Sequence, residues 1–175
     1  MRYKIKKNRH YPSWTWPAFL KGMGCKGTEY SIGYQVKFDE SCKYIIPSED
    51  QYDWNKLFGF YFGVHGIHKN SIIFGWRYNP RSNQIEIARI VYFNGQHTMT
   101  HIITRMCGIN VDEKHLFNIS YQIEDGKIIA RFRVDDRVYE EFYSAPAACM
   151  RFGCGLYFGD NQKAPNTMYV EMDEV

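Results

Sequence analysis

The sequence predicts an all-β protein, folded as a β-sandwich or jelly roll of about ten antiparallel strands. Three observations support this. Apolar and polar residues alternate along several segments, tight-turn sequences separate these segments at short intervals, and no long segment has the 3.6-residue period of an amphipathic helix. Since 175 residues leave room for one domain of ordinary size, we expect a single β-sandwich domain over residues 1–175.

The first half of the chain contains four predicted strands. Residues 28–38 alternate most clearly, with an aromatic or aliphatic side chain at every second position. Residues 71–78 and 84–93 form a hairpin around a turn rich in Asn, Pro and Ser. Asn94-Gly95 is the strongest hairpin signal, because both residues tolerate the positive φ of a type I′ turn. It predicts that residues 96–105 continue the meander.

The second half of the chain has the same pattern. Asp125-Gly126 and Asp135-Asp136 are tight-turn sequences between alternating segments. We expect any helix to be one short turn, near residues 111–115. The remaining predicted strands are 116–124, 127–134, 137–143, 151–158 and 167–173.

Two regions lack this alternation and are expected to be loop-rich. One is an N-terminal arm over residues 1–27, and the other spans residues 47–69. Aromatic residues make up 17% of the chain, and most of them occupy alternating strand positions, where packing in a sandwich explains them. Trp14, Trp16 and Trp54 lie instead in the loop-rich regions, so they are candidates for stacking on a glycan or a partner protein.

Charge and cysteine content limit the function classes. The net charge is only +3, and the basic residues are scattered except near the N-terminus. This argues against nucleic-acid binding, for which the N-terminal arm is the remaining candidate. Five cysteines without a CxxC pair indicate free thiols in a reducing compartment. The sequence has no secretion signal and no apolar stretch long enough for a membrane span. We therefore expect synthesis in the cytoplasm, with incorporation into a virion as one destination.

Three separated segments carry a resemblance to a known group. They are residues 53–59 (DWNKLFG), 70–78 (NSIIFGWRY) and 157–166 (YFGDNQKAPN). Over residues 50–175 the chain resembles uncharacterised bacterial and phage proteins with a concanavalin A-like, lectin/glucanase-type sandwich. The resemblance implies a concanavalin A-like jelly roll and does not by itself assign chemistry. The chain departs from the usual Gly, His and Asp of that group at Asp160, Asn166 and Thr167.

Two constellations suggest hydrolysis or metal binding. Glu171 and Asp173 share one face of the last predicted strand, like a fragment of the glucanase acid motif. Glu174 points to the other face of that strand. His65 and His68 lie in a Gly-rich loop where they could line a polar pocket; a metal site with Asp53 is the less favoured alternative. His97 and His101 are too far apart along one strand to share an ion. We expect no metal and no cofactor.

A third constellation suggests a lyase. Polysaccharide lyases on jelly rolls use Tyr, His, Arg and Lys or Gln on a concave face to neutralise a uronate and abstract its proton. Alternation along the strands does not show whether the candidate residues in this chain share such a face. The alternative for Arg77 and Glu86 is a cross-strand ion pair. The candidate residues are Arg77, Tyr78, Glu86, Tyr92, Arg131 and Arg133.

These observations favour a non-catalytic recognition or structural module, either a lectin-like glycan binder or a phage particle component. Its partners would be a glycan, further copies of the chain or other virion proteins. The alternative is a polysaccharide-cleaving enzyme, a glycoside hydrolase or a polysaccharide lyase, and whether the chain is an enzyme stays open. The candidate ligand-binding residues are Trp14, Trp16, Trp54, His65, His68, Arg77 and Glu86.

Overall fold

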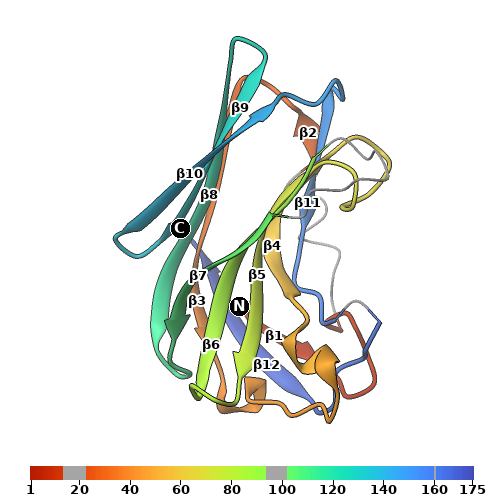
Figure 1. Ribbon diagram of the computed structural model, residues 1–175, viewed down its shortest axis with the longest axis vertical. Helices are drawn as coiled ribbons and strands as arrows, with labels where there is room; N and C mark the ends of the chain where they lie inside the picture. Colours follow the sequence, from red (N-terminus) through yellow and green to blue (C-terminus); the bar gives the residue numbers. More distant parts are fainter. Residues whose placement is uncertain (14–22, 94–101, 160) are drawn as a thin grey trace.

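The computed structural model describes residues 1–13, 23–93, 102–159 and 161–175, with the side chains of 102–104 left out of the description. Within these residues, twelve strands form two antiparallel six-stranded sheets that face each other (Figure 1). This arrangement confirms the predicted jelly-roll β-sandwich.

Sheet A contains both chain ends and the long strands of the second half of the sequence. In spatial order it is β1 (Arg2–Ile5), β12 (Met168–Glu174), β3 (Glu29–Phe38), β8 (Lys114–Glu124), β9 (Lys127–Val134) and β10 (Arg137–Ser144). Sheet B contains the strands from the middle of the sequence. In spatial order it is β2 (Gly24–Cys25), β11 (Met150–Cys154), β4 (Asn55–Phe62), β5 (Ser71–Asn79), β6 (Gln84–Tyr92) and β7 (Ile102–Ile109).

Aromatic side chains fill the space between the two sheets. Phe74 and Trp76 of β5 are fully buried there. The ring of Phe74 lies edge-on to Phe117 and Phe132 of sheet A, at centroid distances of 5.2 and 5.3 Å. Edge-to-face pairs of this kind add to the gain from burial. The high aromatic content is therefore largely explained by the core of the sandwich.

The structure confirms several of the strands predicted from the alternation of apolar and polar residues. Strand β9 has the predicted bounds, and β3, β5, β6, β8, β10 and β12 differ from prediction by one or two residues at their ends. The Asp125-Gly126 turn has φ of 48° and 71° at its two residues, as a type I′ hairpin requires. Asn94-Gly95 and most of residues 96–105 lie outside the described residues.

Three local predictions are wrong. Residues 47–69 are not merely a loop, because they contain β4, a central strand of sheet B. No helical turn forms at 111–115, where β8 begins at Lys114. The helices in the described part of the chain are short 3₁₀ turns at Glu40–Cys42 and Glu49–Tyr52. Strand β11 ends at Cys154, so the following residues to Phe158 form a loop with an isolated bridge. Within the described ranges, no helix is long and apolar enough to cross a membrane.

Strand β4 contains a β-bulge that shapes the outer face of sheet B. Lys56 is opposite Gly75 of β5 and Phe58 is opposite Phe74, so Leu57 is the extra residue. Leu57 and Phe58 both pack into the core between the sheets. Lys56, like Gly75, consequently faces away from the core. Bulges often redirect a side chain next to a functional site in this way.

Substitution of Phe74 by Ala should strongly destabilise the fold, because the side chain is 0% exposed at the centre of the core. We expect the free energy of unfolding to fall by about 3–5 kcal/mol, measured by urea denaturation. Phe142→Ala is the matched control, since Phe142 is 62% exposed on β10. If the two variants lost similar stability, the described core would be wrong.

Candidate functional site

The outer face of sheet B is the face that points away from the sandwich core. Strand register assigns its residues, because side chains alternate between the two faces. Lys56, Gly75, Ala88 and Arg105 occupy adjacent positions across β4, β5, β6 and β7. A small apolar cluster of Ile73, Ile90 and Tyr92, with Trp54, Ile67 and Cys154 packed against it, lies on the same face. This face therefore combines charged, aromatic and apolar side chains.

Lys56 is an unusual residue in this setting, because its side chain is only 1% exposed. Its ammonium lies 5.5 Å from the centre of the Tyr157 ring. Burial raises the pKa of the nearby Cys154 thiol to about 12, while the charge of Lys56 acts in the opposite direction. Cys154 is thus held as a neutral thiol at ordinary pH, and Lys56 provides positive charge beside Tyr157.

Backbone hydrogen bonds fix the loop that carries Tyr157 to β4. The amide of Lys56 donates to the carbonyl of Tyr157 at 2.9 Å, and the amide of Tyr157 donates back to Lys56 at the same distance. Two residues later, the amide of Gly159 donates to Oδ1 of the buried Asn55 at 2.6 Å. Gly159 has φ of 67° and no room for a Cβ, which would lie 2.1 Å from the carbonyl oxygen of Gln162. The position of the Tyr157 ring is therefore set by β4.

His10 packs directly on Tyr157. The two rings are stacked with centroids 5.2 Å apart, and Tyr11 lies edge-on to Tyr157 at 4.9 Å. Nδ1 of His10 is 2.8 Å from the backbone carbonyl oxygen of Phe158. Because a carbonyl only accepts hydrogen bonds, Nδ1 carries the proton in the neutral ring, and Nε2 is the nitrogen that can accept one.

These three side chains have complementary chemical roles. The Nε2 atom of His10 can accept a proton, the hydroxyl of Tyr157 can donate one, and Lys56 supplies a fixed positive charge. They come from residues far apart in the chain and meet at one end of β4. We call His10, Lys56 and Tyr157 the Tyr157 cluster.

A second charged group lies on the same face, across β5, β6 and β7. Arg77 and Glu86 are opposite each other on β5 and β6, and their side chains form an ion pair at 2.8 Å. Arg105 of β7 approaches the other oxygen of Glu86 at 3.4 Å. The guanidinium of Arg77 also lies 4.1 Å from the centre of the Trp54 ring. The expected Arg77–Glu86 cross-strand pair is therefore confirmed, as part of a larger group.

Glu86 is 1% exposed, yet it is held in its charged form. Burial acts to raise its pKa, but hydrogen bonds from Asn79 and Arg77, together with the charges of Arg77 and Arg105, outweigh this effect. The pKa of Glu86 therefore lies below its ordinary value. Glu86 is an anchor for two arginines and is poorly suited to act as a general acid.

The structure separates the ligand-binding residues predicted from the sequence. Trp54, Arg77 and Glu86 come together on the outer face of sheet B. His65 and His68 lie in the exposed β4–β5 loop, where the ring of His68 is edge-on to Tyr92 at 5.1 Å. Trp14 and Trp16 lie outside the described residues. Whether any of these residues binds a ligand stays a prediction.

The residues predicted for a lyase do not all share one face. Arg77, Glu86 and Tyr92 are on the outer face of sheet B, whereas Tyr78 points into the core. Arg131 pairs with Glu140 on the opposite side of the sandwich, on the outer face of sheet A, to which Arg133 also belongs.

The acidic residues of the last strand have partners outside the Tyr157 cluster. Glu171 is on the outer face of sheet A, where its carboxylate lies 3.9 Å from the Lys37 ammonium. Asp173 pairs with the amino group of Met1. Among the described side chains, no group of three or more His, Cys, Asp or Glu residues could hold a metal ion.

Sequence patterns alone do not identify Lys56, Tyr157, His10 or Arg105 as site residues. The available signal is a lone lysine in the aromatic segment 55–62, since lysine is rarely buried in a strand of this kind. Tyr157 and His10 carry no local signal, because their contact depends on the tertiary fold.

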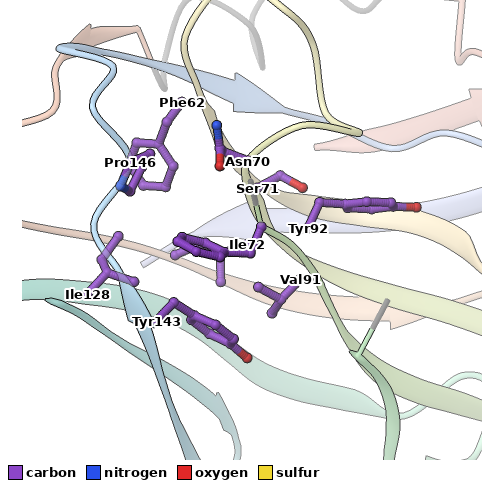
Figure 2. A pocket seen from close by; sticks show the side chains of 10 residues that line it. Phe62, Asn70, Ser71, Ile72, Val91, Tyr92, Ile128, Tyr143 and Pro146 are labelled. Carbon is purple, nitrogen blue, oxygen red and sulfur yellow. The ribbon is translucent and has the colours of Figure 1, made fainter. Parts of the chain in front are cut away.

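A separate hollow opens between the ends of the two sheets, on the inner side of sheet B (Figure 2). Ile72, Val91, Ile128 and Tyr143 line it, while Tyr92 points away toward the outer face. Its cavity volume is about 10 Å³. Ligand sites are usually larger, about 300–1,000 Å³. The hollow is therefore a weaker candidate than the outer face of sheet B.

Solved structures similar to this chain include several polysaccharide lyases. Alginate lyase AlyC3 in complex with dimannuronate matches with a TM-score of 0.62 and 10% identity, over 99% of this chain and 73% of that one. An alginate lyase from Pseudomonas aeruginosa matches with 0.56 and 10%, over 93% and 67%. Alginate lyase A1-II′, of polysaccharide lyase family 7, matches with 0.54 and 12%, over 98% and 76%. At these identities the likeness shows a shared fold.

Sequence comparison finds no matching family model and no matching curated protein. The resemblance to uncharacterised bacterial and phage proteins is thus supported only in its coarser part, the jelly-roll sandwich. Synthesis in the cytoplasm, a homo-oligomer and virion partners stay predictions.

The comparisons contradict the hypothesis of a non-catalytic recognition or structural module, whether lectin-like or part of a phage particle. Many of the matching solved structures are alginate lyases, so the findings favour the alternative, a polysaccharide-cleaving enzyme. The hypothesis depended on the lack of a secretion signal, the free thiols and the resemblance to phage proteins. None of these three features reports on the side chains that a sheet face brings together.

Substitution of Glu86 by Gln should destabilise the protein, because Arg77 and Arg105 lose their shared carboxylate. We expect the free energy of unfolding at neutral pH to fall by about 2 kcal/mol in urea denaturation. The matched control is Glu140→Gln, in the cross-strand Arg131–Glu140 pair, which has the same sequence separation but is exposed. That variant should change stability by less than about 0.5 kcal/mol. Equal losses would contradict the role given to Glu86.

The stability lost in the Glu86→Gln variant should depend on pH. The pKa of Glu86 is lowered by folding, so its contribution to stability is present above the ordinary carboxyl pKa. It is lost as the pH falls through the lower pKa of the folded state. The difference in unfolding free energy between wild type and Glu86→Gln should therefore shrink in acid. A difference that grows in acid would contradict the lowered pKa.

Proposed function

We propose that this protein is a polysaccharide lyase that cleaves a uronate-containing glycan by β-elimination at the Tyr157 cluster. The observation that carries the proposal is the convergence of a proton acceptor, a proton donor and a buried cation in His10, Tyr157 and Lys56. β-Elimination requires these three functions together: a base, an acid for the leaving oxygen, and a charge that neutralises the carboxylate.

In the proposed reaction, Nε2 of His10 removes the proton from the sugar carbon that bears the carboxylate. Negative charge then develops on the carboxylate, and the ammonium of Lys56 stabilises it. The electron pair forms a carbon–carbon double bond as the bond to the glycosidic oxygen breaks. The hydroxyl of Tyr157 protonates that oxygen. Transfer of a proton from His10 back to Tyr157, through solvent, restores both groups.

Two further points support a lyase over a hydrolase. Glycoside hydrolysis ordinarily needs two carboxyl groups flanking the scissile bond. Among the described residues in the strands of sheet B, the one carboxylate is Glu86, and it is bound by two arginines. The solved structures with a similar fold include a lyase in complex with dimannuronate, a disaccharide of uronates.

Substitution of Tyr157 by Phe removes the proton donor and keeps the ring that packs on His10. We expect the rate of elimination on alginate and related polyuronates to fall by about 10²–10⁴-fold. The measurement is the ultraviolet absorbance of the conjugated double bond that each cleavage creates. Circular dichroism and the urea midpoint should remain those of the wild type.

The matched control is Tyr11→Phe, because Tyr11 touches the same ring but is exposed and has no proposed part in proton transfer. It should retain wild-type activity. The proposal would be overturned if Tyr157→Phe retained full activity. It would also be overturned if the wild-type protein produced no unsaturated ends from any polyuronate, including polymannuronate, polyguluronate and polygalacturonate.

A further inference from the structure

We propose that Arg105, together with Trp54 and Arg77, forms a second subsite that binds a uronate carboxylate at a distance from the Tyr157 cluster. The substrate would then be a polyanionic chain with acidic sugars at several positions, and a single uronate in a neutral chain would bind poorly. The inference depends on the proposed function for the identity of the polymer.

Strand register places the two sites on one face. Lys56, Gly75, Ala88 and Arg105 are adjacent across four neighbouring strands. With strands 4.7–4.9 Å apart, the backbones of Lys56 and Arg105 are separated by roughly 14 Å. The two residues between them are small, and the side chain of Ile90 lies over Gly75. A ligand that reaches from the Tyr157 cluster to Arg105 must therefore be longer than one sugar ring.

The charge balance of the group favours an anionic ligand. Two arginines share one carboxylate, so the group of Arg77, Glu86 and Arg105 carries a net positive charge. Arg77 is firmly held, by Glu86 at 2.8 Å and by the backbone carbonyl of Tyr52 at 2.6 Å. Arg105 has a longer contact of 3.4 Å and is 57% exposed. Arg105 is thus the member of the group that can turn its planar guanidinium to a carboxylate in solution.

Trp54 adds a surface suited to a sugar ring. Its indole is partly exposed and lies beneath the guanidinium of Arg77, which fixes its orientation. Aromatic rings with one apolar face and a polar edge commonly contact ligands that are themselves both apolar and polar. Trp54 precedes β4 and Arg105 is on β7, three strands away, so a ring stacked near Trp54 and a carboxylate bound by Arg105 would belong to different sugars of one chain.

Binding measurements on the catalytically impaired Tyr157→Phe protein test this subsite without turnover. The probes are an oligouronate, the same oligomer with its carboxylates reduced to alcohols, and a sulfated glycan of similar length. We expect calorimetry to show binding of the oligouronate and at least tenfold weaker binding of the reduced oligomer. Adding Arg105→Gln should weaken oligouronate binding by about tenfold or more and leave the reduced oligomer unaffected.

Arg131→Gln is the matched control, because Arg131 also pairs with a cross-strand Glu but lies on the outer face of sheet A. Equal effects of Arg105→Gln and Arg131→Gln on oligouronate binding would overturn the subsite. Tighter binding of the sulfated glycan than of the oligouronate would overturn its assignment to carboxylates. If binding depends on Arg105 but the wild type never forms unsaturated ends, the subsite stands and the lyase proposal fails.

Discussion

Burial of β4 on both of its faces is the constraint on which the rest of the structure depends. Its inner face packs into the aromatic core, and its outer face carries Lys56 at 1% exposure. The bulge at Leu57 makes both possible, since it places two successive apolar residues inward and leaves Lys56 outward. The loop with Tyr157 then bonds to the same residues of β4, so the candidate site forms only when the sandwich is complete.

Charges buried on a sheet face are costly unless the structure provides partners. Glu86 meets this requirement with Arg77, Arg105 and Asn79, and Lys56 lies beside the Tyr157 ring. Apolar residues at positions 56 and 86 would stabilise the folded state as well or better. The presence of a buried lysine and a buried glutamate on the same outer face is therefore easier to explain by function than by folding.

The sequence is sufficient to predict the sandwich, because half-buried strands such as β9 have an apolar residue at every second position. It is insufficient for β4, whose residues are nearly all buried and so lose that alternation. The Arg77–Glu86 pair is predictable because a short turn places the two residues opposite each other. The contact of His10 with Tyr157 is not, since it joins residues that only the completed fold brings together.

A crystal structure of the Tyr157→Phe protein with a bound oligouronate tests the central claim most directly. The account predicts a saccharide on the outer face of sheet B, with one carboxylate near Lys56 and another near Arg105. Substrate density on the outer face of sheet A, or in the hollow lined by Ile72 and Tyr143, would contradict it.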